Sequence, residues 1–165
     1  MSDWQLRALN ANDAESYLAH WLALPGAVRY RCFGRIVPDA ELRTLAESIV
    51  AEGRVVCGMF APDGSIAGLA QAFPCGEGCF ELSFSVLPEW QGNGFGRSAG
   101  ERLCRMLGAR GARELRLRCQ RSNLSMRALA VCLGFDLTPR GEMLVGERTL
   151  MRPGTGGLRA DLAQV

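Results

Sequence analysis

Three glycines, Gly92, Gly94 and Gly96, alternate with other residues just before a stretch that has helical periodicity. Glycine adopts backbone angles that other residues avoid, and it lets a ligand come close to the main chain. The first turn of a helix has unpaired N–H groups and the positive end of the helix dipole. The segment therefore predicts an anion site, most often for phosphate, although a simple connecting turn has the same composition.

Apolar and polar side chains alternate in the segment 79–86, which leads directly into the glycines. This period of two predicts a strand with one apolar and one polar face. The polar face carries Glu81, Ser83 and Ser85. A wet cavity beside it would make Glu81 a candidate proton acceptor, whereas the pattern alone favours a strand with one solvated face.

The composition excludes several other chemistries. All 19 basic residues are arginine, so a lysine nucleophile, a Schiff base and the phosphate-loop lysine are ruled out. Cys75 and Cys79 in the segment CGEGC lack the spacing of a zinc knuckle, and His20, the only histidine, is distant. We therefore expect no metal site, two incidental thiols at a hairpin turn, and a surface or packing role for His20.

The chain as a whole has the size and composition of one globular domain, with 165 residues of which 48% are hydrophobic. A net charge of +2 gives no indication of nucleic-acid binding. Seven cysteines without a disulfide framework, no signal peptide and no membrane-length apolar run predict a cytoplasmic protein. The sequence leaves open whether it is a monomer or a homodimer. We expect one domain over residues 1–152 and a flexible tail over 153–165.

The elements that must position these residues follow from turn signals and periodicity. Asn12 and Glu15 resemble a capping box that opens a helix, and Pro62-Asp63-Gly64 predicts a hairpin. The segment 29–37 is read as irregular. The expected strands are 4–9, 54–61, 65–73, 79–87, 114–119, 135–138 and 143–151, and the expected helices are 12–24, 39–52, 95–110 and 123–133. The predicted fold class is α/β, with a mixed, mostly antiparallel central sheet of about seven strands flanked by about four helices.

A dinucleotide fingerprint is one interpretation of the glycine segment, because Gly94-x-Gly96-x-x-Ala99 fits it and Glu114 lies twenty residues further on. In that fingerprint the acid lies at the carboxyl end of the next strand, in a parallel wound sheet. Here Glu114 is near the start of its strand, and the strand before the loop ends an antiparallel run. The pattern therefore disfavours a nucleotide-binding redox domain, which stays as a less favoured alternative.

The segment Gln91-Gly92-Asn93-Gly94-Phe95-Gly96 matches a third fingerprint, Gln/Arg-x-x-Gly-x-Gly/Ala. Here the sequence resembles the GCN5-related N-acetyltransferase family, which binds acetyl-CoA. The segment 84–96 is similar to the family's strand, loop and helix for the cofactor, and 121–135 is similar to its second motif. The two motifs stand in the right order and distance, and the resemblance covers nearly the whole domain.

The resemblance implies a set of cofactor contacts. Main-chain N–H groups of the loop would hold the CoA pyrophosphate, a strand edge would offer its backbone to pantetheine, and Asn123 would bond near the thioester in addition to capping its helix. The loop residues are Gln91, Gly92, Asn93, Gly94, Phe95, Gly96 and Arg97, and the strand residues are Phe84, Ser85 and Val86.

For catalysis, the resemblance identifies a candidate general base more clearly than a candidate general acid. Many family members have a tyrosine acid seven residues after the motif asparagine, where this chain has Ala130, so Ser125 or solvent is the remaining acid. A subgroup resembling bacterial protein lysine acetyltransferases carries a catalytic glutamate on the strand of Glu81, which makes Glu81 the candidate base. Arg29 and Arg31 fall where the family often binds its acceptor and would suit an acidic one.

The sequence thus predicts an enzyme that transfers an acetyl group from acetyl-CoA directly to a primary amine, of a protein lysine or a small molecule. The main alternative is a non-catalytic sensor that binds acyl-CoA through the same loop.

Overall fold

The computed structural model describes residues 3–49 and 53–150. The strands are β1 (Gln5–Ala8), β2 (Val55–Phe60), β3 (Ile66–Gly76), β4 (Cys79–Val86), β5 (Glu114–Gln120), β6 (Asp136–Arg140) and β7 (Met143–Thr149). The α-helices are α1 (Ala14–Ala23), α2 (Gly26–Phe33), α3 (Asp39–Glu47), α4 (Phe95–Ala109) and α5 (Leu124–Cys132), with 3-10 turns η1 (Ala11–Asp13) and η2 (Pro88–Trp90).

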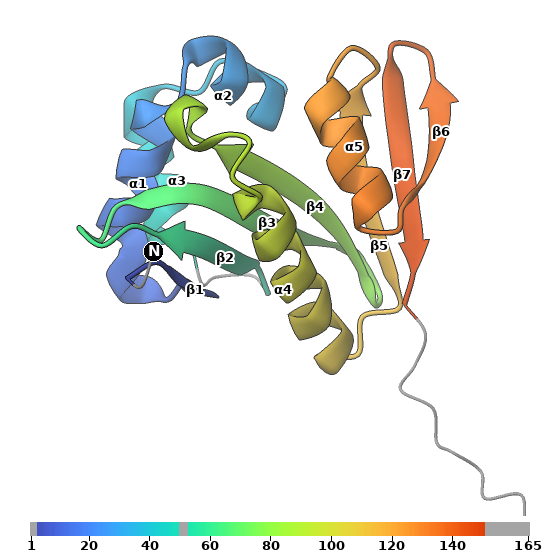
Figure 1. The fold of residues 1–165 in the computed structure, drawn as a ribbon, viewed down its shortest axis with the longest axis horizontal. Helices are drawn as coiled ribbons and strands as arrows, with labels where there is room; N and C mark the ends of the chain where they lie inside the picture. The colour runs from blue at the N-terminus through green and yellow to red at the C-terminus, as the bar shows by residue number, and fades with distance from the viewer. Residues whose placement is uncertain (1–2, 50–52, 151–165) are drawn as a thin grey trace, which may run out of the picture.

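All seven strands of the described residues form one sheet, in the order β1-β2-β3-β4-β5-β7-β6 (Figure 1). Each neighbouring pair is antiparallel except β4 and β5, which are parallel. This confirms the predicted α/β class with a mixed, mostly antiparallel sheet. The described residues contain five α-helices in place of the four that the sequence predicts.

The sheet has a hydrophobic core on each face. Helices α1 and α3 cover one face over the first strands, where Leu42 and Leu69 are fully buried. Helices α4 and α5 cover the other face, where Leu103 and Leu117 are fully buried. Helix α4 lies very close to the sheet at Gly100, because a Cβ there would stand 3.0 Å from the Phe84 ring. Helices thus pack against both faces of the sheet.

The pairing of β4 with β5 is short, and this creates the opening in the molecule. The parallel register begins at Cys79 with Glu114 and ends at Leu82 with Leu117. Beyond Leu82, β4 continues to Val86 paired only with β3. Figure 1 shows the two strands adjacent at one end and apart at the other. The backbone of residues 83–86 therefore has no β5 partner on that side.

Three local predictions were wrong. The segment read as irregular contains the later part of α2, which has no fully buried residue; Val28, Cys32 and Phe33 pack only partly against the core. The capping box lies two residues earlier, with Asn10 accepting from the N–H of Asn12 and Asp13 accepting from the N–H of Asn10. Helix α3 ends at Glu47 rather than at residue 52.

The predicted tail over residues 153–165 lies outside the described residues. Within the described ranges, no helix has both the length and the apolar character needed to cross a bilayer.

Candidate active site

A cleft of about 940 Å³ includes the side of β4 that β5 leaves open. Residues of α2, β4, the glycine loop, the start of α4, the end of β5 and α5 line it. Asn93 and Arg29 are not among the residues that line it. The predicted residues that do line it are Arg31, Glu81, Phe84, Ser85, Val86, Gln91, Gly92, Gly94, Phe95, Gly96, Arg97, Asn123 and Ser125.

The glycine loop has an open backbone at the start of α4. Gly94 is the N-cap of this helix in the left-handed conformation, with φ +76°, and a Cβ added there would meet nothing within 4 Å. The first hydrogen bond of the turn runs from the N–H of Ser98 to the carbonyl of Gly94 at 3.0 Å. The N–H groups of the first helical residues, Phe95 to Arg97, therefore have no helical partner and can receive an anion.

Side chains of the loop hold its shape. Gln91 Nε2 donates to the carbonyl of Val86 at 3.2 Å, and Asn93 Nδ2 donates to the carbonyl of Trp90 at 3.1 Å. The Phe95 ring packs against Trp4, with ring centroids 4.7 Å apart, and Trp4 packs edge-on against Trp90. Loop residues that the sequence marks as cofactor contacts thus also fix the loop to the end of β4.

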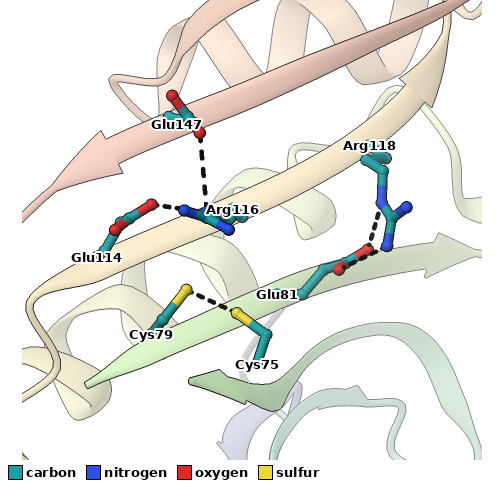
Figure 2. Close-up of polar contacts among 7 residues, drawn as sticks. All are labelled: Cys75, Cys79, Glu81, Glu114, Arg116, Arg118 and Glu147. Atoms are coloured by element: carbon teal, nitrogen blue, oxygen red, sulfur yellow. Dashed lines mark hydrogen bonds and ion pairs between the residues drawn. The ribbon is translucent and has the colours of Figure 1, made fainter. Parts of the chain in front are cut away.

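Glu81 forms a two-point ion pair with Arg118 of β5 (Figure 2). Arg118 Nε donates to Oε1 of Glu81 at 3.0 Å and Nη2 donates to Oε2 at 2.9 Å. Both residues line the cleft, where the Arg118 side chain is 62% exposed and that of Glu81 33%. The hydrogen bond to the carboxylate raises the pKa of Arg118. The sequence analysis missed Arg118; its only signal was the alternation of charges along β5.

A second ion-pair cluster on β5 lies outside the cleft lining. Arg116 Nε donates to Glu114 at 2.6 Å and lies 3.7 Å from a carboxylate oxygen of Glu147 on β7. Figure 2 shows Arg116 directed toward these two carboxylates, while Arg118, two residues on, is directed toward Glu81. These four charged residues of β4 and β5 therefore form two separate pairs.

His20 is buried beneath the cleft and fixes Ser85. Its Nδ1 lies 2.8 Å from the carbonyl of Ile66, which can only accept, so Nδ1 carries the proton. Its Nε2, also at 2.8 Å, then accepts from the hydroxyl of Ser85. Burial lowers the pKa of His20 to about 4, so the ring is neutral at neutral pH. His20 has the predicted packing role, and the Ser85 side chain is engaged on the face away from α4.

The start of α5 faces the cleft through Asn123 and Ser125. Asn123 Oδ1 accepts from the N–H of Met126 at 3.1 Å and so caps α5, which leaves its amide group as a donor at the cleft. Ala130, where the family tyrosine would stand, is fully buried in the core. A tyrosine could not be accommodated there without displacing the α4–α5 core.

Helix α2 supplies the other wall of the cleft. Tyr30, which is 51% exposed, and Arg31 line it, whereas Arg29 pairs with Asp39 at 3.2 Å. Cys32 also lines it, but burial raises the pKa of its thiol to about 11, despite the lowering effect of Arg31. A thiol with that pKa is a poor nucleophile at neutral pH. The sequence analysis gave a role in this segment to Arg29 and Arg31 but not to Tyr30.

Cys75 and Cys79 lie together at the β3–β4 hairpin, with Sγ atoms 2.6 Å apart (Figure 2). Both are reduced. Among the residues that the structure describes, no group of three or more His, Cys, Asp or Glu side chains is placed to hold a metal ion.

The glycine loop, the divergent strands and the helices around them match a known family model. The model of the acetyltransferase (GNAT) family matches residues 26–135, which are 110 of the 165 residues. The chain belongs to the GCN5-related N-acetyltransferase family. It is therefore an N-acetyltransferase, and family membership implies transfer of an acetyl group from acetyl-CoA.

Solved structures share this N-acetyltransferase fold at low sequence identity. The GNAT domain of S. lividans PAT has a TM-score of 0.76 at 16% identity, covering 89% of this chain and 90% of that one. A putative acetyltransferase from Acinetobacter baylyi has a TM-score of 0.75 at 13% identity, covering 93% and 96%. A phosphinothricin acetyltransferase from Sinorhizobium meliloti, solved with acetyl-CoA, has a TM-score of 0.71 at 21% identity, covering 93% and 95%. The curated protein sequences contain no significant match.

The residues of this N-acetyltransferase fit acetyl-CoA. The open glycine loop, the unpaired N–H groups of α4 and the unpaired edge of β4 line one continuous cleft. The sheet is unlike that of a dinucleotide-binding domain, which is parallel and doubly wound, because only β4 and β5 are parallel.

Proposed function

We propose that this N-acetyltransferase transfers an acetyl group from acetyl-CoA directly to a primary amine in the cleft, with Glu81 as the proton acceptor. One observation carries the proposal: the α4 N-terminus, the open edge of β4 and the carboxylate of Glu81 line the same cleft. The acceptor is a protein lysine, as the resemblance to bacterial protein lysine acetyltransferases suggests, or a small amine. The catalytic unit is the single domain of residues 1–152, acting in the cytoplasm as a monomer or homodimer.

The chain binds the cofactor mainly through its backbone. The N–H groups from Gln91 to Arg97 receive the pyrophosphate, and the glycines keep side chains away from it. The edge of β4 between Phe84 and Val86, which β5 leaves unpaired, pairs with pantetheine as an added strand would. The Asn123 amide then bonds near the thioester.

Proton transfer follows from the same geometry. The bound cofactor supplies the acetyl group as an activated thioester. The amine forms a C–N bond to the acetyl carbon, the C–S bond breaks, and Glu81 takes the amine proton directly or through one water. A thiol has an ordinary pKa of about 8.5, so its thiolate is a tolerable leaving group. Ser125 or solvent returns a proton to the sulfur.

The decisive experiment measures acetyl-CoA consumption with a panel of amines and with whole-cell lysate, followed by mass spectrometry of the acetylated products. We expect stoichiometric release of CoA and formation of an N-acetyl product. Tight CoA binding without any turnover would identify the protein as an acyl-CoA sensor instead. Binding of NAD in preference to CoA in calorimetry would favour the nucleotide-binding redox alternative.

A further inference from the structure

The Glu81–Arg118 pair uses only part of what Arg118 offers. A guanidinium has five N–H donors arranged along two edges, each of which can bind one carboxylate at two points. Here the edge formed by Nε and Nη2 binds Glu81. The edge formed by Nη1 and Nη2 remains as a second carboxylate site, on a side chain that is 62% exposed in the cleft.

The charges around the cleft favour an anion at this second edge. Arg31, Arg97 and Arg118 line the cleft, and Glu81 is its only carboxylate among the described residues. Arg97 lies at the cofactor loop and pairs with Glu101, so it belongs to the cofactor end. Arg31 pairs with no carboxylate of the described residues. Arg31 is thus the one arginine of the cleft lining without a carboxylate partner among the described residues, and an acceptor with its own negative charge balances it where a neutral amine does not.

We propose that the acceptor is a small amine that carries a carboxylate close to its nitrogen, as an α- or β-amino acid does, and that Arg118 binds this carboxylate. This inference rests on the proposed acetyl transfer and names its substrate class. Arg118 holds Glu81 on one edge and the acceptor on the other, so the amine is brought next to the base. Only a short amine satisfies both contacts, because one guanidinium sets the separation of the two carboxylates.

The same arrangement gives Arg118 a second effect on the reaction. A guanidinium that binds two carboxylates neutralises each of them less than it neutralises one. Binding of the acceptor carboxylate therefore weakens the hold of Arg118 on Glu81 when the amine is in place. Arg118 is thus a positioning residue for Glu81 and a binding residue for the acceptor.

The test compares each of the common amino acids with its own carboxamide as acceptor, in the wild type and in Arg118→Gln. The measured quantity is the ratio of kcat/KM for acid over amide. Comparing this ratio between proteins cancels the different intrinsic reactivities of the two amines. We expect at least one amino acid for which the wild type prefers the acid, and a fall of the ratio by about tenfold or more in Arg118→Gln, as for loss of a charged hydrogen bond.

Two variants complete the design. Arg116→Gln is the matched control, because Arg116 lies on the same strand, pairs with Glu114 and does not line the cleft, so the ratio should stay at the wild-type value. Arg118→Lys keeps the charge without the two-edged geometry and should lose most of the preference. An unchanged ratio in Arg118→Gln overturns the inference. So does a wild type that acetylates lysine peptides but no amino acid, and that result leaves the proposed acetyl transfer intact. Absence of transfer to every amine overturns both.

Discussion

The two ends of the β4–β5 pair both carry charged side chains that form ion pairs, but they differ in how the two backbones are paired. At the paired end, Arg116 pairs with Glu114 and Glu147, and the ladder between the strands is closed. At the divergent end, Arg118 lies one residue beyond the ladder and pairs with Glu81, which is still within it, beside the cleft. Alternating charged residues are therefore surface ion pairs along the closed ladder and candidate site residues next to the point where it opens. The backbone pairing, rather than the residue type, makes the difference.

The largest expected effect is a difference in turnover between the glutamine variants of Glu81 and Glu114. Glu81→Gln keeps the size of the side chain but cannot take a proton, so turnover should fall by about 10²–10⁴-fold. CoA affinity should stay nearly constant, because the loop and Asn123 are untouched. Glu114→Gln makes the same chemical change at the paired end, outside the cleft lining, and should leave turnover unchanged. Steady-state kinetics and calorimetry measure both, and near wild-type turnover in Glu81→Gln would remove Glu81 as the base.

The second prediction concerns how the divergent end of β4 is held. Ser85 of β4 has no β5 partner, and its side chain is held by neutral His20. Burial lowers the pKa of His20 from 6.5 to about 4. Between these values the unfolded chain binds the proton and the folded chain does not, so stability falls as the pH falls. The loss approaches about 3 kcal/mol between pH 6.5 and pH 4.

Urea denaturation at a series of pH values measures this loss. His20→Gln removes the titrating group and should flatten the slope between pH 6.5 and pH 4, whatever its effect on stability at neutral pH. The Asp13 carboxyl, bound by Arg7, has a lowered pKa and contributes only at still lower pH. An equally steep slope in His20→Gln would show that another group titrates.

The third prediction tests the anion site with two glycines of the same helix. Gly96 has an ordinary φ, and a Cβ there would make only normal contacts, with Leu129 at 3.5 Å and Val86 at 3.7 Å. Gly96→Val should fold and should weaken CoA binding by about ten- to a hundredfold, as expected for loss of a charge-assisted hydrogen bond. Gly108→Val, at the far end of α4, where a Cβ would meet only the Leu150 side chain at 4.0 Å, is the control. Equal CoA affinities of the two variants in calorimetry would contradict the pyrophosphate assignment. Gly94 is unsuitable for this test because its φ of +76° would strain any valine.

The smallest effect is expected for Gln91→Ala. This change removes one hydrogen bond, to the carbonyl of Val86, and leaves the loop amides in place. A single neutral bond contributes about 0.5–1.5 kcal/mol, so CoA affinity should fall only about two- to tenfold. A larger loss than in Gly96→Val would mean that the side chain, and not the backbone, carries the cofactor contact.

Local signals predicted the parts of the fold whose causes are local. The turn Pro62-Asp63-Gly64 was predicted correctly, and Asp63 there accepts from the N–H of Ser65 at 2.9 Å. The strand before the glycine loop begins at Cys79, as its alternation indicates. Helix α2 was missed because none of its residues is fully buried and only Val28, Cys32 and Phe33 pack partly against the core, so its apolar pattern is weak.

Long-range contacts explain what the sequence could not predict at the site. Arg118 meets Glu81 across 37 positions of the chain, and His20 meets Ser85 across 65. Such contacts depend on strand order and register, neither of which a single sequence contains. The motif pointed to the loop, and the family resemblance made Glu81, on the polar face of its strand, the candidate base. The roles given to them, and to Ser125, Arg29 and Arg31, stay predictions.

The short parallel pairing at the centre of the sheet also has a mechanical consequence. Four residue pairs join β4 to β5, and the last of them, Leu82 with Leu117, lies where the two strands separate. Both leucines are buried. A change of volume at this pair should therefore shift the point at which the strands separate, and with it the width of the cleft, which Leu82 also lines.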